Sequence, residues 1–327
     1  MDSFIFAMNA VLPIILTVGI GYLLKRCGLL NLNLAKALNK LVFRIFLPIM
    51  LFLNVYKIKS FSGIGIGYVL YAAVILLAVF FLALPAVLAT TKQLPRRGVL
   101  LQACFRSNYA LVGIPLAQSL FVDAGGAVAS LLSAFSIPAF NILAVISLSV
   151  FREGNEKVKL RGILLDIVKN PLIQSVALGG VALLLRSLFG EWDVSFRLTD
   201  LTPIYKVLES LSALATPIAL LVLGAQFEFS AVPSLKKEII FGVLARLVAV
   251  PLLGVGIAYL FFPSFTGAHF AAFVAMFATP VAVSSVPMTQ EMGGDTVLAG
   301  QLVVWTTLLS TFSIFLCAFL LRLAGVF

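Results

Sequence analysis

Polar side chains of several kinds lie close together inside one long apolar stretch of this chain. Arg106, Ser107, Asn108 and Tyr109 are consecutive there, and Gln118 follows within the same stretch. Arginine and amide side chains are costly inside an apolar segment, so we interpret them as part of a binding site. A buried arginine needs an anion as its partner, and the amide and hydroxyl groups can hydrogen-bond the same ligand. The chemistry that we predict here is recognition of an anion.

The same stretch contains two residues that weaken a helix, Gly113 and Pro115. Pro115 has no N–H to donate, and its ring clashes with the preceding turn. Gly113 adds conformational freedom just before it. We therefore predict that the helix breaks near these residues, at membrane depth. Broken backbone is tolerated at that depth only where it is buried in protein or lines a polar cavity.

A second interrupted stretch, residues 278–295, resembles the first. When Pro115 is aligned with Pro287, Gln118 falls on Gln290. Two interrupted segments at corresponding places in two halves of a chain indicate the binding site of a transporter. The candidate binding residues of the second stretch are Thr279, Pro280, Ser284, Ser285, Pro287, Thr289 and Gln290. Either Pro280 or Pro287 marks the break.

Proline is well placed in the first turn of a helix, so the two stretches predict second half-helices that start near the membrane centre. Such helix starts present unpaired N–H groups and about half a positive charge each. In an inverted repeat they approach from opposite sides and form a site for an anion such as a carboxylate. The alternative is that Ser284, Ser285 and Thr289 only hold helices together, as hydroxyl side chains commonly do in membranes.

Composition places the chain among polytopic membrane proteins. Of its 327 residues, 61% are hydrophobic and 11% charged, against about 25% charged in soluble domains. The net charge of +10 comes from basic residues in short loops, which does not favour a nucleic-acid partner. One histidine and three scattered cysteines do not predict a metal site or a cofactor. No catalytic motif is present, so we do not expect an enzyme.

A membrane span needs about 20 apolar residues. On this rule the sequence predicts an all-α protein with ten transmembrane helices, near residues 4–24, 36–56, 63–90, 98–121, 126–151, 166–188, 204–226, 237–261, 268–291 and 297–322. The side predicted to be cytoplasmic carries fourteen lysines and arginines and the opposite side carries six. This asymmetry predicts a multi-pass plasma membrane protein with both termini outside.

Three weak internal matches indicate a repeat. Residues 13–21 resemble 171–179, residues 48–51 resemble 217–220, and the two interrupted stretches match as described. Each half then holds five spans, and an odd number inverts the second half. We predict a first repeat over residues 1–151, a cytoplasmic linker over 152–165 and a second repeat over 166–327.

These residues resemble the auxin efflux carrier family, whose bacterial members include malonate- and malate-type carriers. The resemblance rests on the opening Leu-Pro-Ile-Ile-Leu at 12–16, the Asn108-x6-Pro115 motif with Gly113 and the Gly-Gly-Asp at 293–295. It implies ten helices with broken, crossing helices 4 and 9, a scaffold of spans 1, 2, 6 and 7, and a mobile unit of spans 3–5 and 8–10. It also implies an elevator-like motion, often a homodimer, and a bacterial inner membrane location. A more distant resemblance is to bile-acid sodium symporters.

We therefore expect a secondary transporter for a small organic anion, auxin-like or dicarboxylate-like. The identity of the anion, the direction of transport and a proton or sodium co-ion are open at this stage. The alternatives are a sodium-coupled carrier like the bile-acid symporters, an anion channel and a membrane sensor. A channel would need a continuous polar stripe, and a sensor would usually carry a soluble signalling domain.

Overall fold

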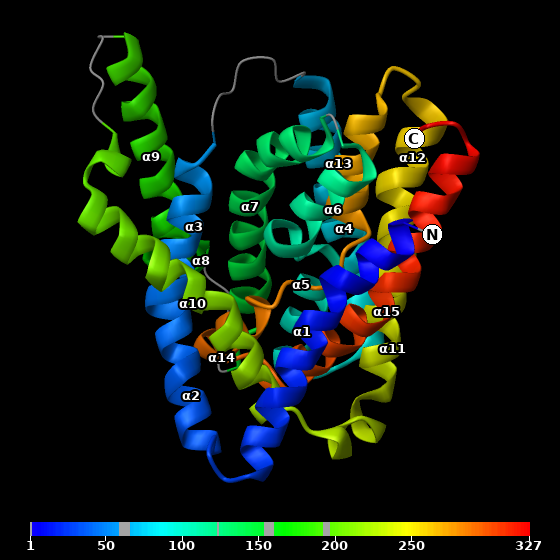
Figure 1. Cartoon of the computed structure of the whole chain (residues 1–327). Helices are drawn as coiled ribbons and strands as arrows, with labels where there is room; N and C mark the ends of the chain where they lie inside the picture. Colours follow the sequence, from blue (N-terminus) through cyan, green and yellow to red (C-terminus); the bar gives the residue numbers. More distant parts are fainter. Residues whose placement is uncertain (1, 59–65, 123, 154–159, 192–196) are drawn as a thin grey trace.

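The computed structural model describes residues 2–58, 66–122, 124–153, 160–191 and 197–327. Within these ranges the regular structure is helical, and the helices gather into one bundle (Figure 1). The extended structure in the same ranges is one isolated antiparallel pair, Ser107 with Val281. The prediction of an all-α protein is therefore confirmed.

Six of the described helical segments are long and apolar enough to cross a membrane, which confirms a multi-pass membrane protein. They are Leu32–Tyr56, α4 (Ile66–Thr90), α7 (Gly125–Val150), α10 (Thr202–Gln226), Pro233–Phe261 and α15 (Thr296–Leu323). The segment Leu32–Tyr56 is composed of α2 (Leu32–Leu41), the π-helical η1 (Val42–Phe46) and α3 (Leu47–Tyr56). The segment Pro233–Phe261 contains η5 (Pro233–Leu235), α11 (Lys236–Leu244), η6 (Ala245–Ala249), η7 (Leu252–Gly256) and α12 (Ile257–Phe261). The chain opens with α1 (Asp2–Arg26), and short 3-10 turns stand at η3 (Leu198–Asp200) and η4 (Phe229–Ala231).

A bent pair of helices gives a seventh candidate span. The amphipathic α8 (Leu160–Lys169) and α9 (Pro171–Glu191) meet at an angle of 63°. The residue before a proline is disfavoured in α-helix, so the chain turns at Asn170. The Asn170 side chain accepts a hydrogen bond from the Leu172 N–H (2.9 Å) and starts the new helix. The span predicted at 166–188 therefore falls on the end of α8 and on α9. Residues 154–159 of the predicted linker lie outside the described residues.

Two helical segments are broken in the middle. One consists of α5 (Leu94–Phe105) and, after the break at residues 106–108, η2 (Tyr109–Gly113) continuing into α6 (Ile114–Leu120). The other consists of α13 (Gly267–Phe277), a break at 278–284, and α14 (Ser285–Met292). The break in the second segment contains Pro280, whereas Pro287 lies in the first turn of α14.

The prediction that the first break lies at Gly113 and Pro115 is wrong. The break is at residues 106–108, and Pro115 lies inside the helix that follows. Three π-helical segments end two residues before a proline: η1 before Pro48, η2 before Pro115 and η6 before Pro251. A proline ring collides with the carbonyl one turn earlier. The wider π turn moves that carbonyl aside, so the chain stays helical.

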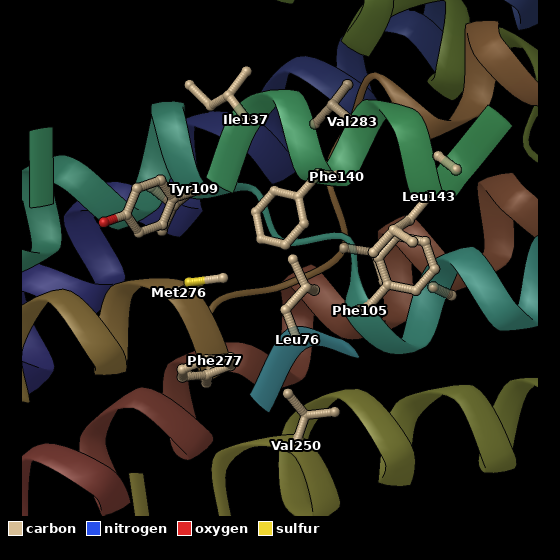
Figure 2. Close-up of a cluster of buried hydrophobic side chains, with 14 of the residues drawn as sticks. Leu76, Phe105, Tyr109, Ile137, Phe140, Leu143, Val250, Met276, Phe277 and Val283 are labelled. Atoms are coloured by element: carbon tan, nitrogen blue, oxygen red, sulfur yellow. The ribbon is translucent and has the colours of Figure 1, made fainter. Parts of the chain in front are cut away.

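The helices pack in two groups, which also meet where α1 packs on α15. In the first, α1 and α3 pack on α10, and α3 packs on α9. Their closeness depends on glycine, since a Cβ on Gly224 of α10 would lie 2.0 Å from the Val18 carbonyl of α1. In the second group, α7 packs on α5, α6 and α13, and α15 packs on α11 and α14. Buried side chains fill the space around the two breaks, among them Phe105, Phe140 and Phe277 (Figure 2).

Candidate functional site

The two broken segments cross at their breaks and hydrogen-bond each other through the backbone. The Asn108 N–H donates to the Pro280 carbonyl (2.8 Å), and the Ala282 N–H donates to the Arg106 carbonyl (3.1 Å). Backbone groups released from a helix inside a membrane need such partners, because no water or lipid group replaces them. The two breaks therefore form one hydrogen-bonded unit, which we call the crossing, rather than two independent kinks.

Two predicted site residues, Ser107 and Thr279, hold this crossing together. Their hydroxyl oxygens lie 2.6 Å apart, and the Thr279 hydroxyl also donates to the Ala275 carbonyl (2.8 Å). Both side chains are buried. Each hydroxyl has a partner inside the crossing, so we assign them to its structure rather than to ligand contact.

Arg106 lies at the crossing with its side chain only 3% exposed. Its guanidinium donates to four side chains, namely Gln102 Oε1 (3.1 Å), Met288 Sδ (2.8 Å), Asn141 Oδ1 (2.9 Å) and Ser284 Oγ (3.2 Å). Every one of these partners is neutral, and no carboxylate pairs with Arg106 among the described residues. Burying an unpaired charge costs several kcal/mol, which an incoming anion can offset.

A cavity lies beside Arg106, with room of about 60 Å³ for the centres of water-sized molecules. One wall is the crossing itself, with residues 106–111 and 282–284, and α7 adds Ile137, Phe140 and Asn141. The opposite wall belongs to the first helix group and consists of Leu47, Met50, Leu51, Ala215, Thr216 and Ala219. Its walls are mostly apolar with a few polar groups at one end, as in most small-molecule sites.

The start of the helix Tyr109–Leu120 faces this cavity. Its first intrahelical bonds run from the N–H groups of Val112 and Gly113 to the Asn108 carbonyl, so the N–H groups of residues 109–111 precede them. At α14 the first turn is satisfied differently, because Ser285 and Val286 donate to the Ala282 and Val283 carbonyls. The helix start at Tyr109 thus offers backbone N–H groups to the cavity. The first N–H groups of α14 instead donate to carbonyls of the break just before it.

Two predicted polar residues have buried atoms without a hydrogen-bond partner, Asn108 Nδ2 and Ser285 Oγ. Asn108 lines the cavity and is only 4% exposed. A buried donor left unpaired costs about 1–3 kcal/mol, so the side chain of Asn108 is poised to donate to a ligand. Tyr109 also lines the cavity, and its hydroxyl donates to the Ala129 carbonyl (2.9 Å).

Several predicted site residues do not reach the cavity. Gln118 is exposed and donates to the Val122 carbonyl (2.7 Å), and Pro115 is exposed as well. Gln290 accepts hydrogen bonds from Asn39 (2.8 Å) and Gln226 (3.1 Å) on the other helix group. None of these three residues lines the cavity, since Gln118 bonds next to its own helix and Gln290 bonds to the other helix group.

Other predicted residues support the crossing from behind. Thr289 accepts from Gln102 (2.9 Å) and so joins α14 to α5. Gly113 allows η2 to approach α13, since a Cβ there would lie 2.9 Å from the Ala275 carbonyl. Pro287 is buried in the first turn of α14, and the Pro280 carbonyl takes part in the crossing described above.

Sequence reasoning missed Gln102 and Met288, and Asn141 stands out in the sequence only as a single polar residue in an apolar span. All three contact Arg106. The spacing of Gln102 and Arg106 was a usable signal, because residues four apart share a helix face. The far wall was also missed. Its residues lie on both sides of Pro48 and of Pro217, the two positions of an internal sequence match, so that match marked cavity residues.

Arg246 of η6 has the most buried charge at the crossing, with 0% exposure. Its guanidinium donates to backbone carbonyls only: Thr279 (2.8 Å), Met276 (2.9 Å), Cys104 (3.3 Å) and Phe105 (3.3 Å). Among the described residues no group of three or more His, Cys, Asp or Glu side chains could hold a metal ion, and the three cysteines are free.

Comparison with known proteins identifies the family of this chain. A family model described as membrane transport protein matches residues 6–163 and 151–318. The chain belongs to this family. It is the family of the auxin efflux carriers, so the resemblance seen in the motifs is confirmed. An uncharacterized transporter of Methanocaldococcus jannaschii is 27% identical over 245 residues, which cover 73% of this chain and 74% of that relative. A transport function for this multi-pass membrane protein follows from the family.

Proposed function

We propose that this family member is a secondary carrier that binds a small organic anion in the cavity beside Arg106. The observation that carries the proposal is the buried guanidinium with only neutral protein partners. A carboxylate in the cavity meets Arg106, the free Asn108 amide and the helix start at Tyr109. All three features favour negative charge at the same end of the cavity.

The walls of the cavity favour a monocarboxylate with an apolar body over a dicarboxylate. Arg106 is the only cationic side chain that lines the cavity among the described residues. The far wall is mostly apolar, with Leu47, Met50 and Leu51. Its hydroxyl group, that of Thr216, contacts the Met50 sulfur (4.0 Å), and no cationic side chain of this wall could pair with a second carboxylate. Removing that carboxylate from water without a partner costs several kcal/mol. An alkyl or aromatic body instead gains from burial against these side chains.

We further propose ten membrane spans, in which the two halves of the chain are inverted copies and the crossing moves as a unit. Support comes from two helices broken near their middles and joined antiparallel at the breaks. The cavity lies between the two helix groups, which correspond to the scaffold and mobile units implied by the family. Rigid motion of one group against the other exposes such a site to each side in turn. The charge asymmetry supports cytoplasmic placement of the more basic side, with the termini outside.

A thermal-shift and titration experiment on the purified protein tests the anion site. Hexanoate is expected to raise the melting temperature, because a ligand that binds the folded state stabilises it. Adipate, which differs by a second carboxylate, is expected to bind at least about tenfold more weakly. The variant Arg106→Gln should weaken hexanoate binding by about 2–5 kcal/mol, roughly 30-fold or more.

The control is Arg322→Gln, which removes an exposed arginine from the last turn of α15 and should leave binding unchanged. Unchanged hexanoate affinity in Arg106→Gln would refute the anion site. Tighter binding of adipate than of hexanoate would refute the monocarboxylate preference and leave the site itself standing. Repeating the titration with sodium replaced by choline separates a sodium-coupled carrier from one that binds the anion alone.

A further inference from the structure

The Arg246 guanidinium occupies a pocket made of backbone oxygens. Four carbonyls surround it at 2.8–3.3 Å, and its side chain has no exposure. Cys104 and Phe105 are the last two residues of α5, Met276 is in the last turn of α13, and Thr279 lies in the break that follows. One side chain from a third segment thus contacts both broken helices where their first halves end.

The carbonyls at these helix ends need a cation for two physical reasons. The last carbonyls of a helix have no intrahelical partner, and a helix carries about half a negative charge at its C-terminal end. Two such ends meet at the crossing, which amounts to about one negative charge. The single positive charge of Arg246 balances them, and no carboxylate pairs with it among the described residues.

The same oxygens connect Arg246 to the anion site on the other side of the crossing. The Thr279 carbonyl accepts from Arg246, and the Thr279 hydroxyl contacts Ser107. Ser107 stands between Arg106 and Asn108, which both line the cavity. The Phe105 carbonyl, which also accepts from Arg246, directly precedes Arg106. A change in the spacing of the two breaks therefore changes where Arg106 and Asn108 are held.

We propose that Arg246 is a positioning residue that acts as a built-in monovalent cation for the crossing. It holds the two breaks at the spacing that directs Arg106 and Asn108 toward the ligand. Arginine suits this place because its planar group donates in several fixed directions, whereas lysine offers a compact point charge. Removing the side chain leaves four converging carbonyls, a site for a small planar cation with N–H donors.

Chemical rescue of the Arg246→Ala variant tests this assignment. The variant is prepared with and without millimolar guanidinium, and its melting temperature and hexanoate affinity are measured. We expect a lowered melting temperature and at least about tenfold weaker hexanoate binding, both recovered in a saturable way by guanidinium. Tetramethylammonium at the same ionic strength has no N–H donors and should restore neither. The wild-type protein should not respond to millimolar guanidinium.

The variant Arg246→Lys keeps the positive charge but lacks the planar set of N–H donors, so it should bind hexanoate with intermediate affinity. This variant also tests the proposal if Arg246→Ala does not fold. Equal rescue by both cations, absence of rescue, or wild-type affinity in Arg246→Lys would overturn the proposal. The inference goes beyond the anion site and is tested separately from it. If wild-type protein bound no carboxylate, the recovery of the melting temperature by guanidinium would still decide the role of Arg246.

Discussion

At the scale of single residues, Arg106 and Arg246 lie at the same crossing but differ in what surrounds their guanidinium groups. Arg106 donates to side chains and lines the cavity, so a ligand can compete with or complete its contacts. Arg246 donates only to backbone oxygens and has no exposure. The first arrangement suits a group that meets substrate, and the second suits a group that holds structure. Both residues were visible in the sequence as arginines inside apolar segments, and only their neighbours distinguish them.

Asn108→Ala tests the other polar group at the anion site. Asn108 Nδ2 is buried without a partner, so its removal should weaken hexanoate binding rather than folding. A lost hydrogen bond to a charged ligand costs about 1–3 kcal/mol, roughly five- to 150-fold in affinity. The control is Gln118→Ala, which removes an exposed amide from the same helix and should change affinity less than twofold. Equal effects in the two variants, measured by titration, would return Asn108 to a structural role.

At the scale of elements, the sequence predicted that two helices are interrupted but misplaced the first interruption. Proline and glycine were taken as the cause of the break, and Pro115 instead follows a π turn within a continuous helix. Residues 106–108 leave the helix because their backbone groups pair with residues 280–282. Such pairing between distant segments has no local signature. The break in the second segment was predictable, since Pro280 lies inside it.

The candidate site likewise contains residues that the sequence could identify and residues that it could not. Arg106 and Asn108 could be predicted from residue type alone, because polar groups in an apolar segment need a reason to be there. The roles of Met288 and Arg246 could not, because each depends on which distant backbone or side chain it meets. Gln118 and Gln290 were chosen by alignment of two prolines, and both helices turn these side chains away from the cavity.

Gly113→Ala tests the close packing of the broken segment. A Cβ at this position would lie 2.9 Å from both the Ala275 carbonyl and the Tyr109 ring. We expect a lower melting temperature, from a loss of about 1–3 kcal/mol in the free energy of unfolding. Gly19→Ala in α1 is the matched control, since no atom lies within 4 Å of its added Cβ and alanine favours helix. If Gly113→Ala were as stable as Gly19→Ala, the contact between η2 and α13 would be looser than described.

At the scale of the whole molecule, the two helix groups contact each other where α1 packs on α15 and at a polar cluster around α14. In this cluster Gln290 and Glu291 of α14 bond to Asn39, Gln226 and Arg44 of the other group. Hydrogen bonds and one partly exposed ion pair of this kind are weak enough to break and re-form in the proposed transport cycle. An elevator-like motion requires that they separate, because α14 moves with the crossing and α2 does not.

Crosslinking across this cluster tests the central claim that an anion is carried by movement of the crossing. In a variant without Cys27, Cys104 and Cys317, cysteines replace Asn39 and Gln290 and are joined by a short bis-maleimide. The control joins cysteines at Arg96 and Glu238, an ion pair (3.1 Å) within the second group. Uptake into proteoliposomes is measured with hexanesulfonate, a permanent monoanion that does not leak through lipid as a neutral acid.

We predict that the 39–290 crosslink abolishes uptake and leaves hexanoate binding within twofold of the uncrosslinked protein. The 96–238 crosslink should leave both uptake and binding unchanged, because its two helices move together. Full uptake with the 39–290 crosslink verified as complete would contradict the account and show that the anion crosses without movement of the crossing.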